Sequence, residues 1–206
     1  MTISSEVQAS VSCLAQGGIV LLPTDTVYGL AVNPNIEKSV DRLYQLKKRP
    51  KKLPLPIMVA NQNQLSALGL EINQYAVSLL NSEYMPGAVT LVMGFQTKPL
   101  VNWLEGREEC GIRLPNDERL LQILTLTGPL LVTSANIHGA PAIPQSPSEI
   151  LSQLNGKPDL VIEGGKPKSI PSTIVNCRIA PPIIERQGFV SAEQINECLK
   201  AKKIVS

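Results

Sequence analysis

The 206-residue sequence has few aromatic side chains, a single histidine and no closely spaced cysteines, and each shortage excludes a class of site. Cys13, Cys110, Cys177 and Cys198 are scattered and form no C-x-x-C pair, whereas a structural zinc site needs about four Cys or His ligands at close spacing. Any serine-based triad would depend on His138, and no G-x-S-x-G motif accompanies it. The composition therefore excludes a zinc finger and argues against a histidine-based hydrolase.

The sequence also lacks a long apolar run and a strong excess of charge. The apolar segment 17–22 ends at Pro23, far short of the ~20 residues that cross a bilayer. Nineteen basic and seventeen acidic residues leave a net charge of +2, which is too balanced for a protein that coats nucleic acid with its whole surface. The first ten residues contain an acid and no basic region typical of a signal peptide. We therefore expect a cytoplasmic protein with reduced cysteines and no membrane contact.

Short apolar segments and amphipathic segments are interspersed along the chain and predict an α/β (α+β) fold. We expect one domain over residues 1–206, because domains usually contain roughly 100–200 residues. Expected strands are 19–22, 27–32, 56–59, 89–95, 111–114, 130–133, 160–162, 173–175 and 183–185. Expected helices are 7–16, 36–46, 75–80, 117–124 and 191–200, with another that begins at the capping box of Ser146 and Glu149. Their irregular order favours a mixed sheet with flanking helices over a strict βαβ repeat.

The densest cluster of charge is the segment K-K-R-P-K-K at residues 47–52, at the expected end of a helix. Five of the nineteen basic residues lie in these six positions. Lysines here can simply complement the negative end of the helix in water. Alternatively, Lys47 and Arg49 clamp a phosphate, since arginine binds phosphate through two parallel hydrogen bonds and lysine acts as a point charge. Both interpretations place the segment at the surface and stay open at this point.

Polar side chains interrupt two of the apolar strands. Thr24, Asp25 and Thr26 lie between strands 19–22 and 27–32, and the segment T-S-A-N at 133–136 follows another strand. Turns stabilised by Asp, Thr and Ser side chains would account for both segments. A ligand site would also account for them, because ligands commonly bind at strand ends in open α/β sheets. Neither segment has the glycine pattern of a Walker loop or a dinucleotide-binding fingerprint, so those two phosphate sites are excluded.

Three further segments place arginines and hydroxyls in or beside strands. Arg113 interrupts G-I-R-L-P at 111–115, Ser172 lies in P-S-T-I-V at 171–175, and Arg186 ends a strand in E-R-Q-G at 185–188. An arginine in a strand can pack its stem while its guanidinium reaches solvent. No single one of these segments therefore identifies a functional site, and the prediction of a site depends on their occurrence together.

In this order, these segments resemble the YrdC/Sua5 family of L-threonylcarbamoyladenylate synthases. The resemblance rests on G-G-I-V-L-L-P-T-D-T-V-Y-G-L (17–30), K-K-R-P (47–50), P-G-A-V-T (86–90), G-I-R-L-P (111–115), S-A-N (134–136), P-S-T-I-V (171–175) and E-R-Q-G (185–188). The K-x-R and S-x-N motifs together are its most specific part. It implies a twisted mixed parallel and antiparallel sheet with a large, basic concave cleft. It also implies the short form of the family, with the catalytic domain alone and no additional C-terminal Sua5 domain.

The resemblance also implies a reaction. L-threonine, bicarbonate and ATP would give threonylcarbamoyl-AMP and pyrophosphate, with Mg²⁺ bound through the ATP phosphates and no organic cofactor or protein metal ligand. Partner proteins, the tRNA-threonylcarbamoyl transferases, would then modify the tRNA adenosine that follows the anticodon. Adenylyl transfer depends on charge neutralisation and alignment more than on a covalent nucleophile, which suits a chain without a histidine-based triad.

Site residues follow from the resemblance position by position. Lys47, Arg49, Ser134 and Asn136 are expected to be catalytic. The ATP site would comprise these four with Thr133 and Arg186. The L-threonine site would comprise Thr26, Arg113 and Ser172, with Arg113 as the partner of the threonine carboxylate.

The sequence departs from the family pattern at Met58, where many long-form members have a histidine near the threonine site. Threonine would then be recognised by other groups or selected less strictly. Three alternatives remain open: an RNA- or tRNA-binding module that uses the same basic cleft without catalysis, a member of the divergent YciO-like branch, and a carbamoyl transferase. The intact K-x-R and S-x-N motifs argue against the YciO-like branch.

Overall fold

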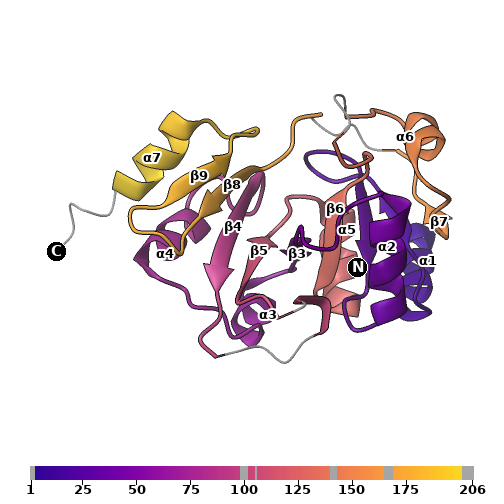
Figure 1. Ribbon diagram of the computed structural model, residues 1–206, viewed down its shortest axis with the longest axis horizontal. Helices are drawn as coiled ribbons and strands as arrows, with labels where there is room; N and C mark the ends of the chain where they lie inside the picture. The colour runs from indigo at the N-terminus through magenta and orange to yellow at the C-terminus, as the bar shows by residue number, and fades with distance from the viewer. Residues whose placement is uncertain (1–2, 98–101, 105, 140–142, 165–168, 201–206) are drawn as a thin grey trace.

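Helices and strands are interspersed along the chain much as the sequence predicts (Figure 1). The computed structural model describes residues 3–97, 102–104, 106–139, 143–164 and 169–200, and over these ranges it has seven α-helices and nine strands. The helices are α1 (Ser5–Ala15), α2 (Glu37–Leu46), α3 (Gln62–Ala67), α4 (Gln74–Leu80), α5 (Glu118–Thr127), α6 (Pro147–Gln153) and α7 (Ala192–Lys200). The strands are β1 (Val20–Leu22), β2 (Gly29–Val32), β3 (Ile57–Met58), β4 (Val89–Gly94), β5 (Glu109–Arg113), β6 (Leu130–Ser134), β7 (Leu160–Val161), β8 (Thr173–Asn176) and β9 (Ile183–Arg186). All the expected elements are confirmed to within a few residues, and α3 is an additional helix that no pattern in the sequence indicated.

The strands pair into one mixed sheet in the order β7-β1-β2-β6-β3-β5-β4-β8-β9. The pairs β1/β7, β3/β5 and β4/β8 are parallel, and the other five are antiparallel. This confirms the expected mixed sheet. Strands that are far apart in sequence are therefore neighbours in space, such as β2 with β6 and β4 with β8 (Figure 1).

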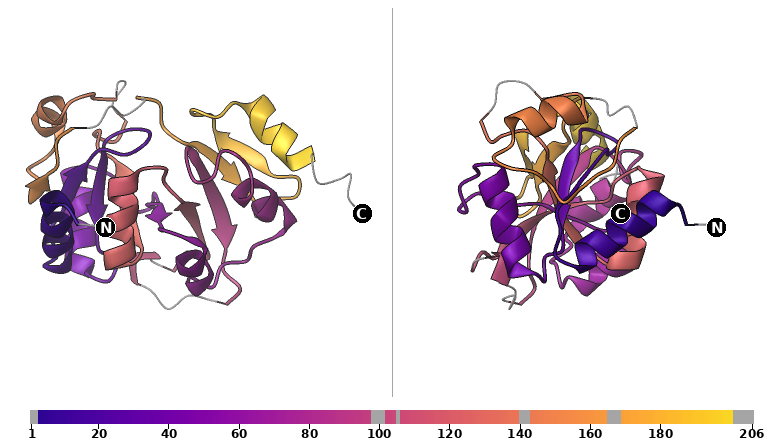
Figure 2. Two further views of the ribbon diagram at one scale, coloured as in Figure 1. Left: turned by 180° about the vertical axis from the view of Figure 1, so that it is seen from behind. Right: turned by 90° about the vertical axis from the view of Figure 1, so that its right-hand side faces the viewer.

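Helices cover both faces of the sheet, which gives the protein two apolar cores (Figure 2). On one face, α1 and α5 pack their buried residues, among them Val7, Leu14 and Ile123, against β1, β2 and β6. On the other face, α2, α4 and α7 contribute to a larger core. In the right-hand view of Figure 2, α2 lies on one side of the sheet and α1 with α5 on the other.

The alternation of side chains along β4 separates the larger core from a cavity. Val89, Leu91 and Met93 point into the larger core, as the period of two in a strand requires. Thr90 and Val92 point to the opposite face and line a cavity there. Thus α1 and α5 cover much of the β1, β2 and β6 part of this face, and the cavity lies over β5, β4 and β8 and extends to residues of β2 and β6.

Local capping follows the sequence closely at two helices. At the start of α7, Gln194 N donates to Ser191 Oγ at 3.3 Å and Ser191 N donates to Gln194 Oε1 at 2.9 Å, so the expected reciprocal cap is confirmed. At α6, Ser146 Oγ accepts from Glu149 N at 3.3 Å as expected, but the Glu149 carboxylate accepts from Gln145 N at 2.9 Å and not from Ser146 N, so only one half of the capping box is present. In the part of the chain that the structure describes, no helix combines the length and the apolarity needed to cross a bilayer.

Candidate active site

A cavity of about 260 Å³ opens on the β5, β4 and β8 part of the sheet. Its lining comprises Thr24, Thr26, Val27, Gly29, Arg49, Pro54, Leu55, Pro56, Met58, Thr90, Val92, Glu109, Cys110, Gly111, Arg113, Val132, Thr133, Ser134, Pro171, Ser172, Ile174, Glu185 and Arg186. Seven of the nine residues expected at the site belong to this lining, whereas Lys47 and Asn136 lie outside it. The charged groups of the lining are three arginines and two glutamates. The large basic cleft therefore stays a prediction.

The polar turn after β1 forms one wall of the cavity. Thr24 Oγ1 donates to the carbonyl of Val27 at 2.7 Å and accepts from the backbone N–H groups of Thr26 and Val27 at 3.2 and 3.3 Å. Thr24 and Thr26 are both buried, and their hydroxyls lie 3.2 Å apart. The turn is thus stabilised by its own side chain, as the sequence predicts, and it also holds Thr26 against the cavity.

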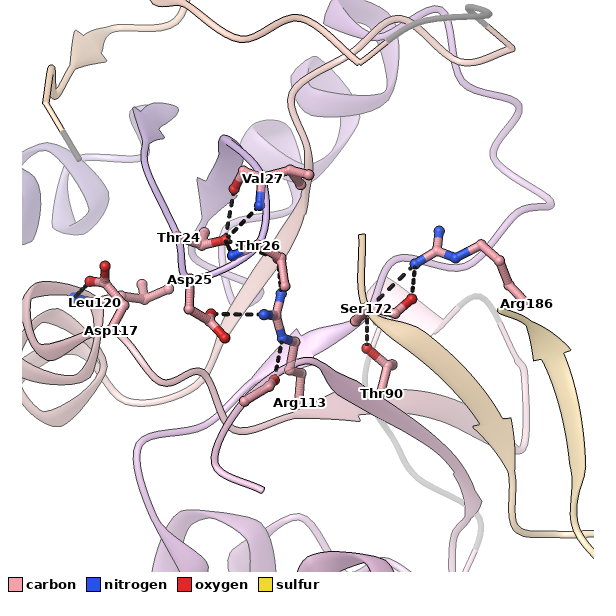
Figure 3. A network of polar contacts seen from close by, with 11 residues as sticks. Thr24, Asp25, Thr26, Val27, Thr90, Arg113, Asp117, Leu120, Ser172 and Arg186 are labelled. Carbon is pink, nitrogen blue, oxygen red and sulfur yellow. Dashed lines mark hydrogen bonds and ion pairs between the residues drawn. The ribbon is translucent and has the colours of Figure 1, made fainter. Parts of the chain in front are cut away.

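Arg113, the last residue of β5, is fixed by three neighbours (Figure 3). Its Nε donates to the carbonyl of Gly87 at 2.9 Å, one terminal nitrogen donates to Thr26 Oγ1 at 2.8 Å, and the other pairs with Asp25 Oδ1 at 2.7 Å. Burial lowers the pKa of the guanidinium, and the carboxylate of Asp25 opposes that shift. Arg113 is therefore a buried cation with a counter-ion in place, and not an arginine whose head reaches solvent.

Ser172 lies directly before β8 and is contacted from two sides (Figure 3). Its hydroxyl oxygen is 2.8 Å from Thr90 Oγ1 on β4. A terminal nitrogen of Arg186 donates to the carbonyl of Ser172 at 2.8 Å and lies 3.4 Å from its hydroxyl oxygen. The chain can approach this closely because residue 188 is glycine, where a Cβ would lie 2.2 Å from the carbonyl oxygen of Pro171. The segments P-S-T-I-V and E-R-Q-G thus form a single wall.

Three guanidinium groups face the cavity from different segments. Arg49 follows α2 and donates to the carbonyls of Leu53 and Pro54 at 3.3 and 2.9 Å. Burial lowers the pKa of Arg186, and the charges of Arg113 and Arg49 lower it further. Because arginine stays protonated in proteins, the three positive charges act on the same space. An anion between them would relieve this repulsion.

Lys47 is buried, which corrects the expectation of an exposed basic segment. Only 1% of its surface is exposed, and its Nζ donates to the carbonyl of Ser134. Burial, followed by the charge of Arg49, lowers its pKa to about 7. The backbone carbonyl of Lys47 also accepts from His138 N at 3.1 Å. The K-x-R and S-x-N motifs are therefore joined through Lys47, although it does not line the cavity.

The residues of the T-S-A-N segment at 133–136 differ in whether they line the cavity. Thr133 and Ser134, at the end of β6, line the cavity. The side-chain amide nitrogen of Asn136 donates to the carbonyl of Ile137 at 3.1 Å. Its Oδ1 is buried and has no hydrogen-bond partner among the described residues. Asn136 is thus placed next to the cavity wall, with an acceptor that a donor could still satisfy.

Several polar residues at the site are not among the nine expected from the sequence, and Asp25 and Thr90 are two that contact expected site residues. Asp25 was part of the polar turn, but its pairing with Arg113, 88 positions later, is not visible in a local pattern. Thr90 interrupts an apolar strand at a position that faces away from the core, and this interruption was a signal that could have identified it.

Met58 lines the same cavity. Burial raises the pKa of Cys110, also in the lining, to about 12, so its thiol is a weak nucleophile.

No group of three or more Cys, His, Asp or Glu side chains suited to a metal ion occurs among the described residues. The expectation that Mg²⁺ is bound through the phosphate oxygens of ATP stays a prediction.

Comparisons with known proteins identify the family. A family model described as telomere recombination (Sua5/YciO/YrdC) matches residues 12–188. The threonylcarbamoyl-AMP synthase of Pyrococcus abyssi is 32% identical over 197 residues, which is 94% of this chain and 57% of that protein. A putative threonylcarbamoyl-AMP synthase of Methanocaldococcus jannaschii is 33% identical and is matched over 90% of this chain and 86% of its own length.

The same relationship holds in three dimensions. The crystal structure of P. abyssi Sua5 complexed with L-threonine matches this fold with a TM-score of 0.84 at 31% sequence identity, over 94% of this chain and 57% of that chain. The chain thus spans little more than half of the P. abyssi relative. The matched segment includes the sequence motifs and the cavity that they line, and the chain belongs to the Sua5/YciO/YrdC family.

Proposed function

We propose that this chain is an L-threonylcarbamoyladenylate synthase, a nucleotidyltransferase that makes threonylcarbamoyl-AMP and pyrophosphate from L-threonine, bicarbonate and ATP. The observation that carries this proposal is the convergence of Arg49, Arg113 and Arg186 on one cavity that also presents buried hydroxyls. ATP and bicarbonate are anions and threonine carries a carboxylate, and the relatives named above carry this activity in their names.

The amino acid would occupy the part of the cavity near Arg113. A guanidinium has five N–H donors, and the neighbours described above engage three of them, which leaves two for an α-carboxylate. Thr26 and Ser172 supply hydroxyls on either side. Because Asp25 already holds Arg113 in place, a carboxylate ligand would meet a donor that needs no reorientation.

The reaction has two steps whose atoms balance. The neutral amino group of threonine forms an N–C bond to the carbon of bicarbonate, and one N–H proton leaves with the hydroxyl of bicarbonate as water to give a carbamate. A carboxylate oxygen of the carbamate then bonds to the α-phosphorus of ATP, and the bond from that phosphorus to the bridging oxygen breaks to release pyrophosphate. Arg49, Arg186 and Ser134 would bind the phosphates, and Mg²⁺ would enter with ATP to neutralise their charge.

Lys47 would stabilise the negative charge of the ATP phosphates, although its side chain does not line the cavity. Its amine has a pKa of about 7, so an approaching phosphate would favour the protonated form. Asn136, whose Oδ1 is an unsatisfied hydrogen-bond acceptor, would contact the nucleotide. The product would pass to the tRNA-threonylcarbamoyl transferase proteins in the cytoplasm.

The deciding experiment is pyrophosphate release from ATP, with threonine and bicarbonate omitted in turn. The proposal requires that both omissions abolish release and that the nucleotide product is threonylcarbamoyl-AMP. Release with carbamoyl phosphate in place of threonine and bicarbonate would support a carbamoyl transferase instead. RNA binding that weakens steeply with salt, without turnover, would support the RNA- or tRNA-binding module.

A further inference from the structure

Thr90 is a buried hydroxyl in an otherwise apolar strand, and packing alone does not account for it. It is 4% exposed and lies between Val89 and Leu91, whose side chains point to the opposite face of the sheet. A valine has nearly the same shape, so the hydroxyl serves a purpose other than filling space. Its oxygen lies 2.8 Å from the hydroxyl of Ser172.

Two contacts fix the rotamer of Thr90. Its methyl group faces Gly111 on the neighbouring strand β5, where a Cβ would lie only 3.3 Å from Thr90 Cγ2. Its hydroxyl faces Ser172 on the other side, because β4 and β8 are parallel neighbours (Figure 3). Gly111 thus leaves room for the methyl group, and the hydroxyl is directed at Ser172.

Ser172 needs such a neighbour because its hydroxyl can rotate. The backbone at Ser172 is held independently, since Arg186 donates to its carbonyl at 2.8 Å and Thr173 N donates to the carbonyl of Ala88 at 2.9 Å. The hydroxyl itself has one proton and two lone pairs, and nothing in the backbone determines which of them faces the cavity. Arg186 can only donate, so the partner that can either donate to or accept from Ser172 Oγ is Thr90.

We propose that Thr90 is a positioning residue that orients the hydroxyl of Ser172 toward the amino-acid substrate. When Thr90 donates to Ser172, the proton of Ser172 is directed away from Thr90 and is available to a substrate oxygen. Thr90 therefore sets the affinity for the amino acid and has little effect on ATP. This inference rests on the proposed function, which places threonine beside Ser172.

The experiment uses three variants of the intact protein. Thr90→Val removes the hydroxyl and keeps the shape, Thr90→Ser restores the hydroxyl, and Thr125→Val is the matched control. Thr125 lies on the exposed side of α5, where its hydroxyl donates to the carbonyl of Leu121 at 2.7 Å. For each variant we would measure the KM for threonine, the KM for ATP and kcat from pyrophosphate release, and the Kd for threonine by calorimetry.

Thr90→Val is expected to raise both the KM and the Kd for threonine about tenfold, the usual effect of one lost hydrogen bond, with the KM for ATP changed less than twofold. Thr90→Ser is expected to recover most of the affinity, and Thr125→Val to leave all values unchanged. A loss of stability without a change in the threonine constants would mean that Thr90 is only structural. An equal rise in both KM values would also overturn the inference.

The double variant Thr90→Val with Ser172→Ala tests whether the two hydroxyls act together. If Thr90 acts through Ser172, the double variant binds threonine no more weakly than Ser172→Ala alone. Independent, multiplicative losses would overturn the inference. Wild-type protein that binds threonine but releases no pyrophosphate would refute the proposed function, and the Kd values would still decide the role of Thr90. Wild-type protein that does not bind threonine would refute both.

Discussion

The burial of Lys47 gives the stability of this protein a distinctive dependence on pH. An unfolded lysine has a pKa of about 10.4, whereas burial lowers that of folded Lys47 to about 7. Between these values the unfolded chain binds a proton that the folded protein does not. The free energy of unfolding must therefore rise with pH across this window.

The magnitude follows from the linkage relation. The contribution of Lys47 to the free energy of unfolding is expected to rise by about 1.4 kcal/mol for each pH unit between about 7 and 10. Lys47→Met keeps the length and apolar character of the stem and removes the titrating amine. The difference in the free energy of unfolding between wild type and Lys47→Met should therefore change by about 2.5 kcal/mol between pH 7.5 and 9.5.

Urea unfolding at several pH values measures this difference directly. Lys52→Met is the matched control, because Lys52 belongs to the same basic segment and is exposed, and its difference from wild type should stay flat. When the curve of unfolding free energy against pH of a variant is subtracted from that of wild type, the titration of all other groups cancels. A difference between wild type and Lys47→Met that is flat, or that falls as pH rises, would show that Lys47 keeps its proton in the folded protein.

The remaining predictions concern the cavity. Asp25→Asn removes the counter-ion of a buried guanidinium and should lower the free energy of unfolding by about 3–5 kcal/mol; a loss below 1 kcal/mol in urea unfolding would argue against a buried pair. Arg113→Lys keeps the charge but loses the planar fork, so the threonine KM should rise at least tenfold, and an unchanged KM would return Arg113 to a structural role. Replacing all four cysteines by alanine should preserve kcat, because burial raises the pKa of both Cys110 and Cys177 to about 12; lost turnover in the folded variant would reopen nucleophilic catalysis.

Much of the fold could be predicted from local patterns in the sequence. Strands such as β1 and β6 are short apolar runs bounded by turn residues, and α5 and α7 have recognisable caps at Asp117 and Ser191. Helix α3 was missed because it has six residues and a single buried side chain, Leu65, so it shows no periodicity. Strand order was not predictable, because pairs such as β2 with β6 depend on contacts about 100 residues apart.

The candidate site was predictable in its membership and less so in its arrangement. The burial of Lys47 had a signal in the sequence, since Lys47 follows Val40, Leu43 and Tyr44 at helical spacing and continues their buried face. Clustering with other charges concealed that signal. The pairing of Asp25 with Arg113 is a tertiary contact, and no spacing rule within either segment reveals it.

The lining of the cavity is drawn from Thr24 through Arg186, which covers most of the chain. Strands β4, β5, β6 and β8 and the turn after β1 must all be in place before the cavity exists. Ligand binding would therefore depend on the assembly of the whole sheet and not on the folding of one local segment. Ligand at one hundred times its Kd would stabilise the folded state by about 2.7 kcal/mol, and amide protons along the whole sheet would share the added protection against exchange with solvent.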